Sequence, residues 1–113
     1  MRFNKQIINI PIYQCSIVFG GYKQLGFDED IKTDFGTKRA SCRMIDGDVW
    51  FYYSDSIGGS ILAHEVVHMA NMIFTMKGIQ ANETNDEHLA YLVEYIYKQL
   101  SEKIFNTKER YKK

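Results

Sequence analysis

The residues best suited to chemistry lie in one short apolar stretch, ILAHEVVHMA, at positions 61–70. His64 and His68 are four residues apart, so on an α-helix they share one face with Cβ atoms about 5 to 6 Å apart, and both imidazoles can turn toward one ion. Glu65 lies one residue further round the helix, too far to ligate that ion but near enough to accept a proton from a water molecule beside it. The spacing therefore predicts a metal site with a general base.

An alternative interpretation is that the two histidines are ordinary core residues and that Glu65 is a surface carboxylate on a packed helix. Three polar side chains in one buried helical turn would each need a partner or cost about 1 to 3 kcal/mol in desolvation. One metal ion supplies a partner to both histidines at once. We therefore expect a bound metal ion rather than two buried histidines without a ligand.

The pattern H-E-x-x-H at residues 64–68 is the zincin motif, in which Zn²⁺ lowers the pKa of a water molecule toward ~7 and polarises the scissile carbonyl. Metzincins extend this motif with Gly and His, and this chain has Asn71 and Phe74 at those positions, which excludes them. Two histidines do not complete a zinc site, so a third ligand is expected. A motif followed by a helix that bears E-x-x-A resembles the gluzincins, whose third ligand is the glutamate of that second helix.

Two segments carry a closer resemblance: GGSILAHEVVHMANMI at 58–73 and DEHLAYLVEYIYKQL at 86–100. Together they resemble the small H-E-x-x-H zinc metallopeptidases encoded in phage genomes and prophages. The common pattern is a Gly/Ser-rich lead-in, H-E-x-x-H, and then D-E-x-x-A-Y-L; the resemblance covers residues 40–100 and is specific in these two segments. It implies that His64, His68 and Glu87 ligate Zn²⁺. It also implies Glu65 as the general base for hydrolysis of a protein or peptide substrate, in the host cytoplasm if the gene is phage-borne.

The third ligand has rivals within the same segment. His88 adjoins Glu87 where the family pattern usually has a non-ligating residue, so it competes for the metal. Thr84 and Glu87 also form a capping box, which would give Glu87 a purely structural role at the start of the helix. The remaining alternatives are Asp86, Glu83, or no protein ligand at all.

Peptide hydrolysis also needs a donor for the oxyanion that forms in the transition state. Tyr91 lies one turn beyond Glu87 on the same helical face, which makes it the leading candidate, with His88 and Tyr95 as others. A tyrosine on an amphipathic helix is otherwise a core residue. The strand DVWFYY leads directly toward the metal helix, and an exposed edge there would pair with an extended peptide, whereas a covered strand would only build the core.

The elements that position these residues follow from periodicity and turn signals. A strand is expected over 6–19, at a sheet edge or with an irregularity at Pro11, and a short helix around DEDIKTDF is closed by Gly36. Asp46-Gly47 between two β-rich runs predicts a hairpin. Apolar spacing predicts helices over 57–77, with Ser56 or Ser60 as N-cap and Gly78 as the end, and over 84–105. The expected class is α+β, with a small antiparallel sheet of about three strands packed against the H-E-x-x-H helix and a C-terminal helix.

Composition limits the classes of function. A chain of 113 residues with 45% apolar and 25% charged residues is expected to form a single domain over 1–113. Fourteen basic residues balance fourteen acidic ones, which disfavours nucleic-acid and anionic-membrane binding. No run reaches the roughly 18 apolar residues that span a bilayer, so we expect a soluble protein. Cys15 and Cys42 are expected to be reduced, buried residues because no secretory signal is apparent, which points to the cytosol.

A function of another class is a metal-stabilised module that binds or regulates a host or phage protein without hydrolysing it. Such a structural site needs no general base. The presence of Glu65 beside His64 therefore favours the enzyme.

Overall fold

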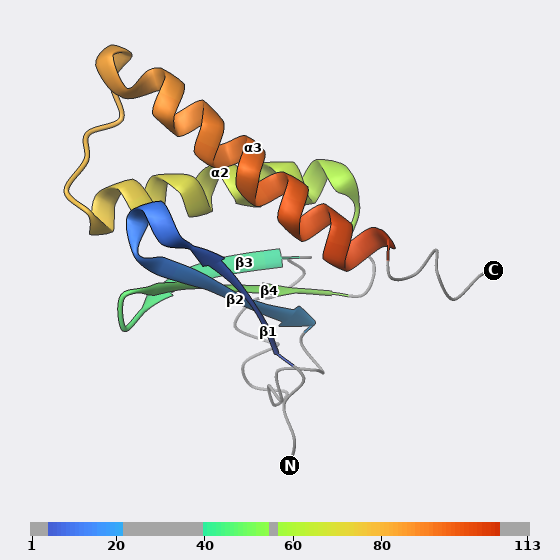
Figure 1. Ribbon diagram of the computed structural model, residues 1–113. Helices are drawn as coiled ribbons and strands as arrows, with labels where there is room; N and C mark the ends of the chain where they lie inside the picture. Colours follow the sequence, from blue (N-terminus) through green and yellow to red (C-terminus); the bar gives the residue numbers. More distant parts are fainter. Residues whose placement is uncertain (1–4, 22–39, 55–56, 107–113) are drawn as a thin grey trace.

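The structure is a computed structural model that describes residues 5–21, 40–54 and 57–106. These residues form two layers, a sheet and a pair of helices that lie across one of its faces (Figure 1). The strands are β1 (Gln6–Ile10), β2 (Cys15–Gly21), β3 (Ala40–Ile45) and β4 (Asp48–Tyr53). The helices are α2 (Gly59–Met76) and α3 (Asp86–Ser101), the latter preceded by a 3-10 turn (Glu83–Asn85) and continued by a π-helical turn (Glu102–Asn106). The expected α+β class is confirmed.

The sheet differs from the expected one in strand number and direction. It has four strands in the order β1-β2-β4-β3, and β2 pairs with β4 in parallel, so the sheet is mixed. The extra strand arises because the segment expected as one strand is a hairpin. Pro11 begins a 3-10 turn, Gln14 follows in the left-handed conformation with φ 50°, and Ile10 then pairs with Cys15. A fixed φ and a missing N–H suit proline to this turn.

The hairpin expected at Asp46-Gly47 is confirmed. Ile45 pairs with Asp48, and the two loop residues both have positive φ, 51° at Asp46 and 83° at Gly47, as a type I′ turn requires. Val49, Phe51 and Tyr53 alternate along β4 and contribute to the core beneath the helices. The short helix expected around DEDIKTDF lies outside the described residues.

The first helix buries one stripe against the sheet and against α3. Its buried residues recur at three- and four-residue spacing: Leu62, Val66, Met69, Ala70, Ile73 and Phe74. Gly58 is the N-cap and offers no side chain, so Ser60 lies inside the helix and is not the cap; Ser56 lies outside the described residues. Gly78, with φ 70°, follows the last turn as expected, and the Ile79 N–H donates to the Phe74 carbonyl.

A 3-10 turn capped by Asn82 precedes the second helix. The Asn82 side chain accepts hydrogen bonds from the backbone N–H groups of Thr84 and Asn85, at 3.0 and 3.2 Å. The N-cap of α3 is Asn85, which makes no side-chain capping hydrogen bond, so the capping box expected from Thr84 and Glu87 is wrong and Glu87 is not committed to that structural role. No helix in the described part of the chain is both long and apolar enough to cross a membrane.

The conformation of the β3–β4 turn yields a test of stability. Gly47→Ala should lower the free energy of unfolding by about 1 kcal/mol because a Cβ disfavours left-handed backbone. No atom lies within 4 Å of the position that this Cβ would take, so the loss measures backbone strain alone. Gly47→Asn should lose less, since asparagine tolerates positive φ. Urea unfolding of both variants checks this, and equal losses would contradict it.

Candidate metal centre

Two imidazole nitrogens meet on the exposed side of α2. The Nε2 atoms of His64 and His68 are 3.2 Å apart, and the rings are tilted by 72° with centroids 4.8 Å apart. Two imidazoles that share one tetrahedral Zn²⁺ place their ligating nitrogens about 3.3 Å apart, from Zn–N bonds of about 2.05 Å. The same distance suits a hydrogen bond between the rings, so the spacing of the two nitrogens fits a shared ion but does not require one.

The burial of the motif differs from the expected burial of all three polar side chains. The His64 side chain is 69% exposed and His68 is also exposed, whereas the Glu65 side chain is only 13% exposed. The desolvation argument for a metal therefore does not hold for these histidines. The reason is the position of each residue around the helix axis. Glu65 lies next to the buried stripe, whereas the two histidines lie further round the helix, on the side that faces solvent.

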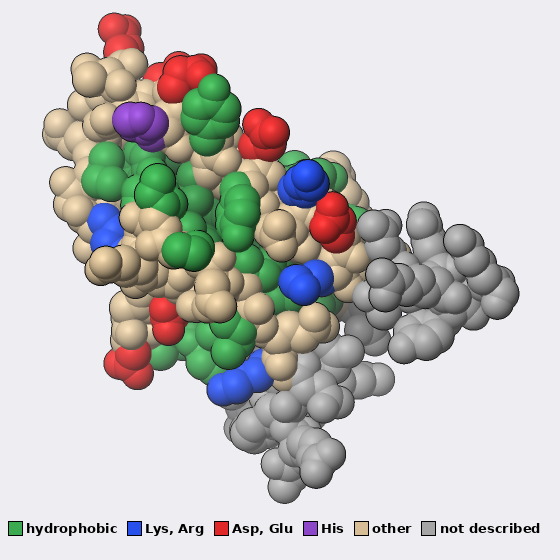
Figure 2. Space-filling model, in the orientation of Figure 1, with side chains coloured by type: hydrophobic (Ala, Val, Ile, Leu, Met, Phe, Trp, Pro, Cys, Tyr) green, Lys and Arg blue, Asp and Glu red, His purple; other side chains and the backbone are tan. Residues whose placement is uncertain are grey.

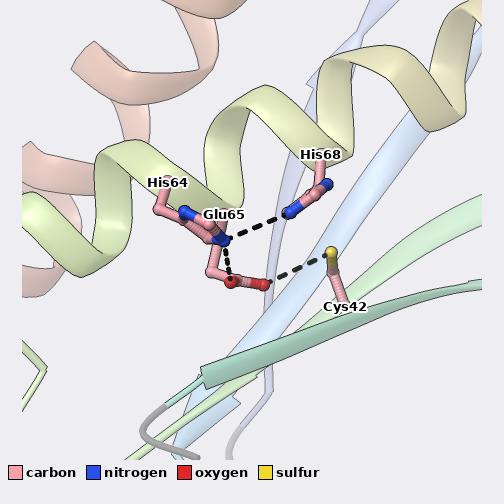
Figure 3. Close-up of polar contacts among 4 residues, drawn as sticks. All are labelled: Cys42, His64, Glu65 and His68. Atoms are coloured by element: carbon pink, nitrogen blue, oxygen red, sulfur yellow. Dashed lines mark hydrogen bonds and ion pairs between the residues drawn. The ribbon is translucent and has the colours of Figure 1, made fainter.

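Glu65 is held between the helix and the sheet by two polar contacts (Figure 3). The Cys42 thiol donates to Glu65 Oε1 at 3.6 Å, and Oε2 lies 3.8 Å from His64 Nε2. Burial raises the pKa of the Cys42 thiol to about 12, and the negative charge of Glu65 and its hydrogen bond add to the rise. The thiol is therefore protonated at neutral pH, and the second carboxylate oxygen faces the histidines.

These side chains line one open hollow of about 480 Å³ between α2 and the edge strand β3. The strand contributes Ala40, Ser41 and Cys42, and the helix contributes Ile61, His64, Glu65, His68 and Met72. The helical residues follow three- and four-residue spacing, so they form a second stripe beside the buried one. Within the described residues, His64, Glu65 and His68 form the group whose ligand atoms all lie within 4.8 Å of one another.

The structure does not bring the expected residues of α3 into this group. Glu87 is exposed in the first turn of α3 and is not part of the cluster. In the close-up, α3 lies on the other side of α2 from the strand that carries Cys42 (Figure 3). Glu87 as a third ligand therefore stays a prediction. To ligate the same ion, its carboxylate would have to move from the described position toward the histidines.

The other expected residues of α3 lie in a different place. His88, Tyr91 and Tyr95 line a second hollow together with the β1–β2 turn, where hydrophobic side chains gather on the face shown in Figure 2. Tyr95 donates to the backbone carbonyl of Asn9 at 3.1 Å, and Tyr91 is 63% exposed. The structure thus does not place Tyr91 beside the histidine pair, where an oxyanion donor would have to lie.

Sequence reasoning missed Cys42 as a neighbour of the motif. Its alternation with Ala40 and Met44 placed the three residues on one face of the strand, which is a usable signal. Which of these three residues lies beside Glu65 depends on how α2 packs on β3, and that tertiary packing could not be predicted from the alternation. Comparison of the chain with protein-family models, with curated proteins and with solved structures gave no match. The resemblance to zinc peptidases therefore rests on the two motif segments alone.

The short distance between the Nε2 atoms of His64 and His68 predicts metal binding. We expect the protein to bind one equivalent of Zn²⁺, and His64→Ala or His68→Ala to abolish stoichiometric binding, because each variant removes one of two closely placed nitrogens. His88→Ala is the comparison variant, since it removes the third histidine of the sequence, which lines a different hollow in the structure. Elemental analysis after dialysis measures the content. Wild-type content in both His64→Ala and His68→Ala would contradict the site.

Proposed function

We propose that this protein is a zinc-dependent metallopeptidase that cleaves a protein or peptide substrate in the cytoplasm. The observation that carries the proposal is the set of three side chains on α2, two imidazoles with Nε2 atoms 3.2 Å apart and a carboxylate oxygen 3.8 Å from one of them. A purely structural metal site needs no general base. The open hollow in front of it supports access by a substrate.

The chain's own residues suit a division of roles. When bound, Zn²⁺ would polarise the scissile carbonyl and lower the pKa of a water molecule. His64 and His68 would hold the ion. Glu65 would accept the water's proton at Oε2, since Oε1 is already occupied by the Cys42 thiol. The same carboxyl could then deliver that proton to the leaving amine.

The position of β3 suggests how a peptide would bind. The strand DVWFYY, considered as a possible edge, is instead an inner strand, because β4 lies between β2 and β3. Among the described strands, β3 pairs on one side only and lines the hollow with Ala40, Ser41 and Cys42. An extended peptide added along this edge would run past the histidines. We therefore propose an unfolded or extended segment as the substrate.

The rival function is a metal-stabilised module that recognises a protein without cutting it. One observation favours it, namely that in the described structure the third potential ligand beside the two histidines is Glu65, which a structural site would use as a ligand rather than as a base. The edge strand and the hollow would serve such a module equally well. The two functions differ in what they require of Glu65, which makes that residue the decisive one to change.

The third ligand can be assigned by comparing two adjacent residues. Because a helix separates neighbours by about 100°, only one of Glu87 and His88 can comfortably face the ion. We expect Glu87→Ala to weaken zinc binding far more than His88→Ala, measured by competition with a chelating dye. The opposite ranking would transfer the role to His88. Unchanged affinity in both variants would remove α3 from the site.

The general base can be tested without disturbing the metal. Glu65→Gln should retain zinc and the fold, because the replacement is nearly isosteric and Glu65 is not expected to be a ligand. Hydrolysis should fall by about 10²- to 10⁴-fold, the usual contribution of a general base. Initial rates on a mixture of quenched-fluorescent peptides, with zinc content measured in parallel, give both quantities.

Two outcomes would count against the peptidase. Loss of zinc from Glu65→Gln would make Glu65 a ligand. Equal biological effects of wild type and Glu65→Gln in the host cell would show that the protein acts by binding.

A further inference from the structure

We propose that Cys42 is the positioning residue for Glu65, whose carboxylate it holds with one oxygen turned toward the histidine pair. This inference rests on the proposed peptidase function. It concerns the edge strand rather than the helix that carries the motif, and it assigns a role to a residue that the motif does not contain.

The contacts of Glu65 distinguish its two oxygens. Oε1 accepts the Cys42 thiol hydrogen at 3.6 Å, and Oε2 lies 3.8 Å from His64 Nε2. A glutamate on a helix has three rotatable side-chain bonds, and an exposed one samples many rotamers. Here the side chain is 13% exposed and is bridged to another element of the fold. The bridge therefore fixes which oxygen faces the site.

The position of Cys42 is itself determined by the sheet. Cys42 pairs with Phe51 of β4, and Phe51 is fully buried beneath the helices, so Cys42 belongs to the same side of the sheet. Its partly buried side chain packs against the core cluster. A thiol at this position combines apolar packing with a hydrogen-bond donor, which neither alanine nor valine supplies. Its proton remains in place at neutral pH because burial raises the pKa of the thiol.

Cys42 is a positioning residue here and not a metal ligand. It lies outside the group whose ligand atoms are all within 4.8 Å of one another, although it lines the same hollow. A cysteine that ligates a metal loses its thiol hydrogen, whereas Cys42 donates its hydrogen to Glu65. Loading the protein with Co²⁺ tests this directly, because a cysteine thiolate on cobalt adds an intense near-ultraviolet charge-transfer band. We expect identical spectra for the wild type and for Cys42→Ser.

The kinetic test compares three substitutions in zinc-loaded protein on a peptide that the wild type cleaves. Cys42→Ala should lower kcat about tenfold with little change in KM, because the base loses its orientation but the peptide loses no contact. Cys42→Ser should recover most of kcat, since its hydroxyl also donates to a carboxylate. Cys15→Ala is the matched control, because it removes the other cysteine, which lies outside the hollow, and should leave kcat unchanged.

Coupling to Glu65 separates positioning from general destabilisation. In the Glu65→Gln background, Cys42→Ala should cause no further loss of kcat, because no base remains to be oriented. Additive losses would overturn the proposal, as would a Cys42→Ser variant no more active than Cys42→Ala, or a thiolate band in the cobalt spectrum.

A measurement that needs no hydrolysis keeps the contact testable by itself. The infrared S–H stretch of Cys42, isolated by subtracting the Cys42→Ala spectrum, should lie at lower frequency in the wild type than in Glu65→Leu. An unchanged frequency would overturn the inference even in an active enzyme. A shifted frequency in a protein that cleaves no peptide would instead mean that the contact exists and that the proposed function has failed.

Discussion

The burial of one helical stripe controls the rest of this structure. Leu62, Val66, Met69 and Ile73 fill the space above the sheet, and each is at most 1% exposed. Once these four positions face inward, the 100° step of the helix determines where every other residue of α2 lies. Glu65, adjacent to the stripe, meets the edge strand, while His64 and His68 open toward solvent. The geometry of the candidate site is therefore a by-product of core packing.

This coupling explains why the site is both ordered and accessible. The core supplies apolar contacts that hold α2 in place, so the polar residues beside it need little stabilisation of their own. The hydrogen bond between the Cys42 thiol and Glu65 is the direct link from this helix to the edge strand at the site. Among the described residues, α2 and β3 are the elements that line this hollow. For the proposed function, a hollow lined from two sides suits a short contact with an extended segment better than enclosure of a large substrate.

The features that could be predicted from the sequence are local ones. Asp46-Gly47 between two β-rich runs predicted the β3–β4 hairpin, and Gly78 predicted the end of α2. The four-residue spacing predicted that His64 and His68 share a face. The number and direction of the strands could not be predicted, because Pro11 could equally mark an irregular strand or a turn, and only packing decides. The exposure of the histidines and the placement of Glu87 and Tyr91 depend on the orientation of α2 about its own axis and on the angle at which α2 and α3 pack. Local sequence patterns do not determine either quantity.

The parallel pairing at the centre of the sheet has a consequence for how the chain folds. β1–β2 and β3–β4 are hairpins closed by short turns, and such local contacts form quickly. Among the described strands, the two hairpins pair through β2 and β4, where Ile17 lies beside Val49 and the Ser16 N–H donates to Asp48 at 2.9 Å. Joining them closes a longer loop than either hairpin turn, so we expect that encounter to be slower than the formation of either hairpin. We expect α2 to pack only after that step, so the contact between Glu65 and Cys42 should form late, whereas the spacing of the two histidines needs only the helix itself.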